Sequence, residues 1–257
     1  MKKFFALFLL ATTSSFSQIK DRELIWAEDF NGTELNLDQW NIIIGNGCPE
    51  LCGFGNNELQ VYTDRNYTLV NGLLTITARK EGETYTSTKI TSAAKKEFQY
   101  GYIEIRAKLP TGHGVWPAFW MLGTNIEKVG WPLSGEIDIL EYVGREPTMV
   151  FNTLHTQASH GYSVNTKKTK IETIEEGFHT FGVDWTKDKM DFYVDGTMVY
   201  TFIPLNKTQA EWPFDQPFYF LLNLAIGGNF GGAYVDDTIF PQDFTIDYIK
   251  VYSQKTN

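Results

Sequence analysis

The chain has 257 residues, of which 42% are hydrophobic and 21% are charged, and its formal net charge is -9. This length suits one large domain or at most two small ones, and the composition excludes a disordered tail and a polytopic membrane protein. The negative charge argues against nucleic acid and an anionic membrane surface as partners, because both favour clustered Lys and Arg. Aromatic residues make up 15% of the chain, which indicates a β-rich protein with an aromatic binding surface.

The first residues have the order of a secretory signal peptide. Lys2 and Lys3 precede an apolar stretch over residues 4–11, and small polar residues follow up to Ser17. The apolar stretch is too short to cross a bilayer as a helix, and no cysteine follows it that could carry a lipid anchor. We expect residues 1–17 to be a signal peptide and residues 18–257 to form one secreted domain, periplasmic or extracellular, without membrane insertion.

The two cysteines, Cys48 and Cys52, become informative if the chain is exported. They lie in the turn-rich segment 47–53, where a disulfide would close a very short loop and contribute about 2 kcal/mol. A zinc site needs more ligands than this pair supplies. Two free thiols are the alternative.

Alternating apolar and polar residues predict half-buried strands along most of the chain. The clearest segments are residues 73–78, 102–108, 190–194 and 244–252. Asp195-Gly196 predicts a hairpin turn between two strands, and residues 172–177 are the best candidate for a helical turn. Many short strands separated by turns predict a single all-β domain, a sandwich of two antiparallel sheets.

Three carboxylates lie within an otherwise apolar strand at Glu136, Asp138 and Glu141. On a strand, Glu136 and Asp138 point to one face, while Ile137 and Ile139 point to the other. Strict alternation would put Glu141 on the apolar face, where burial of an unpaired carboxylate is costly. One extra residue in a β-bulge restores the parity. We therefore predict a bulge between Asp138 and Glu141, with all three acids on one face.

This spacing suits two carboxyl groups that act on the same bond. With the bulge residue discounted, the two glutamates are about four strand steps apart, roughly 13 Å between Cα atoms. On a concave face their carboxyl groups can converge toward the ~5–5.5 Å of a retaining glycosidase. Three acids this close cannot all ionise freely, so at least one pKa must rise. A solvated acidic strand and a metal site are the alternatives.

The segment Glu136-Ile-Asp-Ile-Leu-Glu141 resembles the E-x-D-x-x-E signature of glycoside hydrolase family 16, and the resemblance extends over nearly the whole mature chain. Other matching segments are residues 26–30, 57–62, 101–106, 114–123, 223–228 and 247–252. Together they are similar to the laminarinase branch of the family, endo-β-1,3-glucanases. The resemblance implies a β-jelly-roll sandwich with a concave substrate cleft. The six-residue spacing departs from the five-residue E-x-D-x-E form typical of bacterial lichenases.

The resemblance also implies the role of each acid. Glu136 matches the nucleophile, Glu141 the general acid/base, and Asp138 the assisting carboxylate between them. It implies no catalytic cofactor. The expected partner is a β-glucan polysaccharide, and the expected state is a monomer.

Aromatic and polar side chains are expected to hold the sugar. The candidates are Asn56, Arg106, Trp116, Trp120, Trp131, His155 and Asn223. Trp116 and Trp120 are four residues apart and face the same way on a strand, where their rings can stack on sugar faces. Trp131 is similar to the family's tryptophan beside the cleavage site, and the resemblance places Arg106 in the cleft. For each of these residues a structural role is the alternative, and for Trp26, Trp40 and Trp185 we favour core packing.

A structural calcium ion is common on the convex face in this family. Glu28, the backbone of Gly72 and Asp247 match the usual positions of its ligands. Oxygen ligands from three separate segments suit Ca²⁺.

Several functions compete with β-1,3-glucan hydrolysis. Mixed-linkage β-1,3-1,4-glucan is the nearest alternative substrate. Agarases and carrageenases share the bulged motif, although no basic cluster marks a site for sulfated sugars. A non-catalytic β-glucan-binding protein is the alternative from another class, but such relatives typically lose one or both glutamates, and this chain has both.

Overall fold

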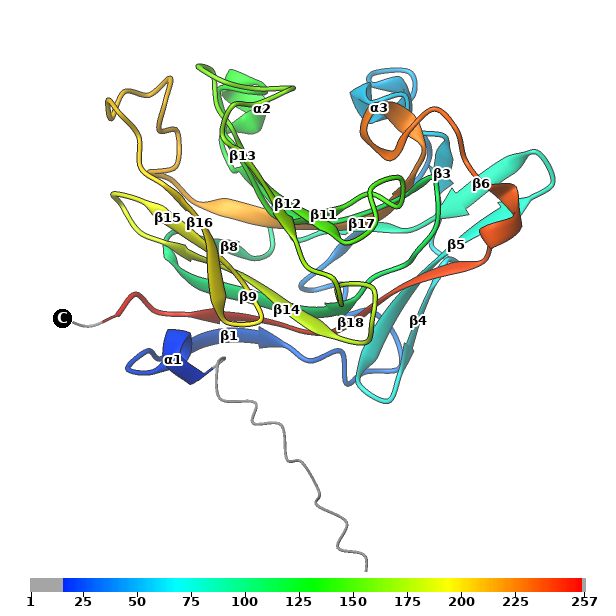
Figure 1. The fold of residues 1–257 in the computed structure, drawn as a ribbon, viewed down its shortest axis with the longest axis horizontal. Helices are drawn as coiled ribbons and strands as arrows, with labels where there is room; N and C mark the ends of the chain where they lie inside the picture. The colour runs from blue at the N-terminus through cyan, green and yellow to red at the C-terminus, as the bar shows by residue number, and fades with distance from the viewer. Residues whose placement is uncertain (1–15, 256–257) are drawn as a thin grey trace, which may run out of the picture.

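The computed structural model describes residues 16–255, and nearly all of its regular structure is β-strand (Figure 1). Residues 1–15 of the expected signal peptide lie outside the described part of the chain. The helices are short: α1 (Phe16–Ile19), α2 (Ile126–Val129) and α3 (Gly228–Gly231), with 3-10 turns at Cys52–Gly55 and Asp237–Ile239. Among residues 16–255, no helix has the length and apolar character needed to cross a membrane.

Ten strands form the first sheet. They are β1 (Leu24–Glu28), β3 (Gln60–Tyr62), β4 (Tyr67–Val70), β5 (Leu73–Glu81), β6 (Thr84–Ser87), β9 (Gly101–Lys108), β14 (His179–Trp185), β15 (Met190–Val194), β16 (Thr197–Phe202) and β18 (Gln242–Tyr252). Their order is β16-β15-β14-β9-β18-β5-β6-β3, with β1 added to β18 and β4 to β5. All of these pairs are antiparallel except β3 with β6.

Eight strands form the second sheet, which carries the acidic motif. They are β2 (Asn41–Ile43), β7 (Lys89–Thr91), β8 (Glu97–Phe98), β10 (Val115–Gly123), β11 (Glu136–Tyr142), β12 (Met149–His155), β13 (Thr166–Lys170) and β17 (Phe218–Ile226). Their order is β13-β12-β11-β10-β17-β7-β2, with β8 added to β17. Figure 1 shows that this sheet is curved and that the segments carrying α2 and α3 rise on either side of its open, concave face.

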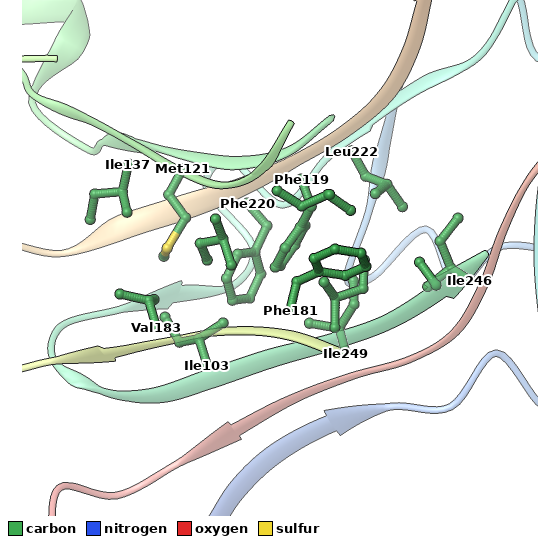
Figure 2. Close-up of a cluster of buried hydrophobic side chains, with 14 of the residues drawn as sticks. Ile103, Phe119, Met121, Ile137, Phe181, Val183, Phe220, Leu222, Ile246 and Ile249 are labelled. Atoms are coloured by element: carbon green, nitrogen blue, oxygen red, sulfur yellow. The ribbon is translucent and has the colours of Figure 1, made fainter. Parts of the chain in front are cut away.

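The hydrophobic core lies between the two sheets (Figure 2). Phe119 and Met121 on β10 and Ile137 on β11 face Ile103 and Ile249 of the other sheet, and all five side chains are fully buried. Because strand residues alternate between faces, burying this set turns the neighbouring side chains of β10 and β11 to the concave face. The core therefore fixes which residues face the site.

The two-sheet antiparallel sandwich predicted from the sequence is confirmed. The four predicted strand segments lie within β5, β9, β15 and β18. Asp195 and Gly196 form the turn between β15 and β16, both with positive φ, as the hairpin signal predicts. Where the sequence predicts a short helical turn, residues 172–175 form a hydrogen-bonded turn and residues 176–177 bend toward the start of β14.

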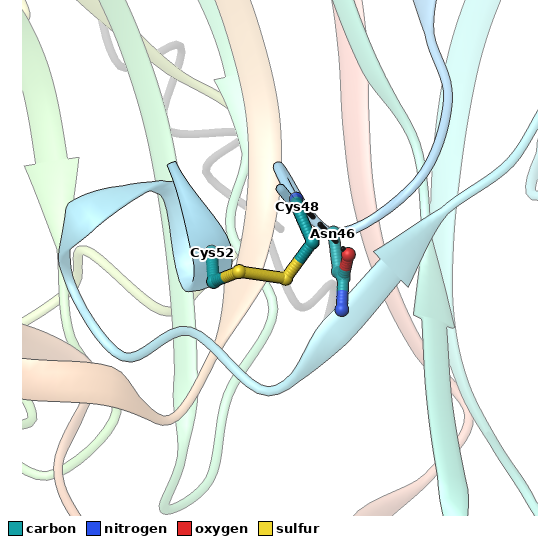
Figure 3. The surroundings of a disulfide bond; sticks show 3 residues. All are labelled: Asn46, Cys48 and Cys52. Atoms are coloured by element: carbon teal, nitrogen blue, oxygen red, sulfur yellow. Dashed lines mark hydrogen bonds between the residues drawn. A yellow bond between two sulfur atoms is a disulfide. The ribbon is translucent and has the colours of Figure 1, made fainter. Parts of the chain in front are cut away.

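The predicted disulfide is present between Cys48 and Cys52 (Figure 3). The backbone N–H of Cys48 donates to Oδ1 of Asn46 at 3.2 Å, and the N–H of Leu51 donates to the carbonyl of Gly47 at 2.7 Å. Two residues after the closed loop, the ring of Phe54 packs on Tyr62 with centroids 5.1 Å apart. The disulfide thus stabilises a loop at one end of the eight-stranded sheet.

Candidate active site

The predicted bulge in β11 is confirmed by the strand register. On β12, Thr153 pairs with Asp138 and Phe151 pairs with Glu141, so two residues of β12 span three of β11. On β10, Leu122 pairs with Glu136 and Ala118 with Glu141, which makes the separation of the glutamates four strand positions, as expected. All three acids consequently face the concave side.

A buried amide supports this bulge. Asn152 on β12 is fully buried, and its Nδ2–H donates to the backbone carbonyl of Ile139 at 2.7 Å. A bulge removes ladder hydrogen bonds, and a buried carbonyl without a partner would be costly. Ile139 and Leu140 are both fully buried in the core, so two consecutive side chains point inward before Glu141 points outward.

Tryptophan N–H groups hold both glutamates. Nε1–H of Trp131 donates to Oε2 of Glu136 at 2.8 Å, and Nε1–H of Trp116 donates to Oε1 of Glu141 at 3.0 Å. Trp131, on the loop after α2, is 45% exposed, so its ring is accessible to a ligand. Each indole therefore fixes the orientation of one carboxylate and keeps an aromatic surface next to it.

His155 completes the group around Asp138. It lies opposite Glu136 on β12, and its Nε2 is 3.3 Å from Oδ2 of Asp138 and 3.9 Å from Oε1 of Glu136. Its ring also packs against Trp131, with centroids 5.8 Å apart. The structure thus brings His155 and Trp131 to the acidic residues, as the sequence predicted.

Burial raises the pKa of all three acids. It raises the pKa of Glu136 to about 8, with the negative charge of Asp138 as the second cause. Burial also raises the pKa of Asp138 to about 8. The pKa of Glu141 is raised well above its usual value, first by burial and then by the charges of Asp138 and Glu136. His155 and one tryptophan N–H lower the pKa of each glutamate, but two like charges raise that of Glu141 and only one raises that of Glu136, which favours Glu136 as the ionised member.

A second group of side chains lies on β17 and β7 beside Trp120. Nε1–H of Trp120 donates to Oδ1 of Asn223 at 2.7 Å, and Asn223 pairs with Ala118 and Lys89 on the neighbouring strands. Asn56 lies farther out, where its carbonyl accepts a hydrogen bond of 2.7 Å from the N–H of Asn229 on α3. The concave face therefore carries sugar-binding candidates on both sides of the acids.

The sequence interpretation missed Lys89, which is only 8% exposed. Its Nζ lies 4.7 Å from the ring centroid of Phe54, 4.9 Å from that of Trp120 and 6.0 Å from that of Tyr62. Burial lowers its pKa, while the nearby charges of Glu58 and Glu136 act in the opposite direction. The sequence offered one signal for this residue: Lys89 is the only charged residue in the run Thr86–Ser92. A lysine is rarely buried without a partner, so a lysine in an uncharged strand indicates a special environment.

Two further residues extend the aromatic surface and carried no sequence signal. His160, for which no role was expected, packs against Trp131 with centroids 5.4 Å apart. Phe230 on α3 packs against Trp116 at 5.4 Å and Phe151 at 5.0 Å. Phe230 reaches the site from a segment distant in the chain, so no local pattern could identify it, whereas His160 lies five residues after His155 on the loop that follows β12.

Comparisons with known proteins agree with the two-sheet fold. The family described as "Glycosyl hydrolases family 16" matches residues 54–250. The chain belongs to this family. A β-glucanase of Rhodothermus marinus is 37% identical over 90% of this chain and 85% of its own length. The crystal structure of a laminarinase from Flavobacterium sp. UMI-01 is 67% identical, with a TM-score of 0.89 over 90% of this chain and all of its own. The laminarinase catalytic domain of Thermotoga maritima MSB8 is 41% identical, with a TM-score of 0.86 over 92% of this chain and all of its own.

The expectation that Arg106 lies in the substrate cleft is wrong. Arg106 belongs to β9 of the ten-stranded sheet, and its neighbours Ile105 and Ala107 point into the core. Alternation turns Arg106 to the outer face of that sheet, where Nη1 pairs with Oδ2 of Asp247 and the guanidinium lies 4.6 Å from the ring of Phe178. In this member of family 16, Arg106 is therefore remote from the acidic motif.

The three segments expected to hold calcium meet at one place on the ten-stranded sheet. Along one edge, β18 pairs with β5 up to Ile246 and with β1 from Ile249 onward. Asp247 lies between these two stretches, where β5 gives way to β1 as the partner of β18. Glu28 ends β1 and Gly72 precedes β5. The carboxylate of Glu28, however, accepts hydrogen bonds of 3.0 Å from Trp40 Nε1–H and from a backbone N–H. The carboxylate of Asp247 likewise pairs with Arg106, so protein donors already contact the side chains of both Glu28 and Asp247.

The raised pKa of Glu141 predicts a pH-dependent gain in stability for the Glu141→Gln variant. Above pH ~4.5 the unfolded chain releases the proton of Glu141, while the folded protein keeps it because burial raises the pKa of this group well above its usual value. Since the unfolded state binds fewer protons in this window, the wild-type protein loses stability as pH rises. Glutamine has no such proton and still accepts the Trp116 hydrogen bond, so the melting temperature of the variant should exceed that of the wild type by a margin that grows from pH 5 to 8.

Glu83→Gln, at an exposed position, is the matched control and should show no such trend. Melting curves of the three proteins across this pH range give the measurement. A margin that is the same at every pH would contradict the assignment of a buried, proton-retaining carboxyl at position 141.

Proposed function

We propose that the protein hydrolyses internal β-1,3-glucosidic bonds of laminarin-type glucans with retention of anomeric configuration. The observation that carries this proposal is the pair of glutamates on one bulged strand, each fixed by a tryptophan N–H and separated by four strand positions. Two carboxyl groups that converge on one bond are the requirement for a retaining glycosidase. The similarity to laminarinases over about nine tenths of the chain supports the choice of substrate.

In the first step, Glu136 attacks the anomeric carbon and forms an ester bond as the glycosidic bond breaks. Glu141 gives its proton to the leaving oxygen, so the released chain carries a hydroxyl group. The high pKa of Glu141 keeps this proton available, and the Trp116 N–H stabilises the carboxylate that remains. Asp138, between the two, raises the pKa of both glutamates by its charge.

In the second step, water replaces Glu136 on the sugar. Glu141, now ionised, takes a proton from the water, whose oxygen attacks the anomeric carbon from the face that the leaving group vacated. The ester bond breaks and Glu136 leaves as a carboxylate, which again accepts the Trp131 hydrogen bond. Two inversions give net retention, and no cofactor is required.

The glucan chain lies across the strands of the concave face. Trp116, Trp120 and Trp131 offer ring faces to the sugars, while Asn56 and Asn223 offer amide groups for hydroxyls. Lys89 adds ammonium donors beside Trp120. The enzyme acts as a secreted monomer. The Cys48–Cys52 bond supports an oxidising compartment, since disulfides persist outside the cytosol.

The proposed substrate is tested by product analysis on laminarin, lichenan, agarose and κ-carrageenan side by side. We expect oligosaccharides from laminarin and fewer from lichenan. κ-Carrageenan should give none because its sulfate groups would need a basic cluster beside the acids, and agarose should give none because the chain is similar to laminarinases. Oligosaccharides from agarose or carrageenan alone would contradict the proposal. Binding of laminarin without any product would instead identify a non-catalytic glucan-binding protein.

The roles of the two glutamates are tested with an aryl glucoside and azide. Glu141→Ala should keep much of its rate of glycosyl-enzyme formation, because an activated leaving group does not need the ~10²–10⁴-fold contribution of a general acid. Without a base for the second step, a covalent adduct should accumulate and be visible by intact mass. Azide needs no base and should restore turnover, giving the β-glycosyl azide.

Glu136→Ser provides the matched comparison. It has no nucleophile, so it should form no adduct and hydrolyse neither glucans nor aryl glucosides. Azide can then only displace the leaving group directly, which gives the α-glycosyl azide, and NMR distinguishes the two products. The opposite pattern, an α-azide from Glu141→Ala and a β-azide from Glu136→Ser, would reverse the assignment.

We also propose that a structural calcium ion binds at the junction of β1, β5 and β18, through backbone oxygens near Glu28 and Gly72 together with Asp247. Oxygen ligands from separate segments suit Ca²⁺, and an ion that binds only the folded state raises its stability by mass action. Chelation should therefore lower the melting temperature and added Ca²⁺ should restore it, with little change in activity at low temperature. A melting curve indifferent to both treatments would remove this proposal.

A further inference from the structure

Three side chains of the site turn one ligand atom each toward a common point. Glu136, Asp138 and His155 supply two carboxylate oxygens and one imidazole nitrogen, all within 4.8 Å of one another. Within residues 16–255 this is the one cluster of three His, Cys, Asp or Glu side chains with such geometry. Two of its contacts involve Nε2 of His155, at 3.3 Å from Asp138 Oδ2 and 3.9 Å from Glu136 Oε1.

The hydrogen bonding leaves these atoms free for a ligand. Asp138 is 3% exposed, and its Oδ2 has no hydrogen-bond partner among the described residues. Glu136 accepts the Trp131 N–H through Oε2, so Oε1 is the oxygen directed at His155. A buried carboxylate oxygen without a donor is unusual, because such groups are almost always satisfied.

The set of ligand atoms selects the kind of ion. Zn²⁺ binds imidazole nitrogen and carboxylate oxygen at about 2.0–2.2 Å in tetrahedral geometry, which places neighbouring ligand atoms ~3.3–3.6 Å apart. The 3.3 Å contact already matches this value, and the 3.9 Å contact needs only a small rotation of the Glu136 side chain. Ca²⁺ and Mg²⁺ prefer six or more oxygen ligands and are poorly served by an imidazole.

We propose that Glu136, Asp138 and His155 bind a divalent transition-metal ion, with Zn²⁺ as the best match, and that the bound ion inhibits the enzyme. Inhibition follows because the ion occupies a lone pair on Oε1 of the proposed nucleophile, Glu136, and binds beside the atoms that must react with the sugar. The binding site stands on the geometry alone, while its inhibitory effect rests on the proposed glucanase function.

The surroundings of His155 argue for an inhibitor rather than a resident cofactor. Zinc-bound histidines almost always donate their second ring N–H to a carboxylate or carbonyl, which strengthens the ligand. Nδ1 of His155 is buried and has no hydrogen-bond partner among the described residues. The site therefore offers three ligands, but its histidine lacks the second hydrogen bond that normally strengthens metal binding. A chelator should consequently remove the ion.

Isothermal titration of the chelator-treated, purified protein with Zn²⁺ tests the binding directly. We expect one site, no heat from Mg²⁺ there, and at least tenfold weaker binding in His155→Gln. Glu136→Gln removes a second ligand and should weaken binding likewise, which guards against a folding defect in the histidine variant. His113→Gln is the control and should bind as the wild type does, because His113 packs against Tyr234 and is not part of the three-residue cluster.

Kinetics with Zn²⁺ then separate this proposal from the proposed function. Zn²⁺ should inhibit laminarin hydrolysis competitively, and EDTA should reverse the inhibition. One Zn²⁺ site that needs His155, in a protein that cleaves no glucan, would sustain the metal site and remove the glucanase assignment. Absence of binding, or equal binding by the wild type and His155→Gln, would overturn the metal site even if laminarin is cleaved. Loss of binding in His179→Gln alone would also overturn it, since His179 pairs with Asp195 on the other sheet.

Discussion

The extra residue between Asp138 and Glu141 determines that all three acidic side chains point to the same, concave face of the sheet. In a regular strand the six-residue motif would send Glu141 into the core, among side chains that are fully buried. The bulge instead turns Ile139 and Leu140 inward together and returns Glu141 to the concave face. Asn152 makes this possible by satisfying the carbonyl that the bulge removes from the ladder. The site therefore depends on a buried hydrogen bond from the neighbouring strand as much as on the acids themselves.

Placing three acids close together on this face lowers the stability of the folded protein, because their negative charges repel one another and are removed from water. Burial raises the pKa of each acid, and the charge of Asp138 raises those of both glutamates further. The two indole N–H groups reduce this cost at two of the acids without adding a positive charge. Such a site is less stable than one with neutral isosteres, as expected where strained or desolvated groups perform the chemistry.

Much of this arrangement could be predicted from the sequence, because strand alternation is a local property. The bulge followed from the parity of Glu136, Asp138 and Glu141, and the orientation of Trp116 and Trp120 followed from their spacing. Alternation does not tell which sheet of a sandwich a strand joins or which face is concave, and this is why Arg106 was misplaced by resemblance. Lys89 and Phe230 reach the face through pairing between distant segments, which no local pattern encodes.

The contrast between the two glutamates arises from their neighbours rather than from the strand. His155 and one tryptophan N–H lower the pKa of each glutamate, so these contacts do not separate the two. The charges differ: only Asp138 raises the pKa of Glu136 by its charge, whereas both Asp138 and Glu136 raise that of Glu141. The glutamate with two like-charged neighbours therefore retains its proton, and the other is left as the carboxylate. His155, which limits the rise in pKa at both glutamates, is also the residue that gives the site its nitrogen ligand for a metal ion.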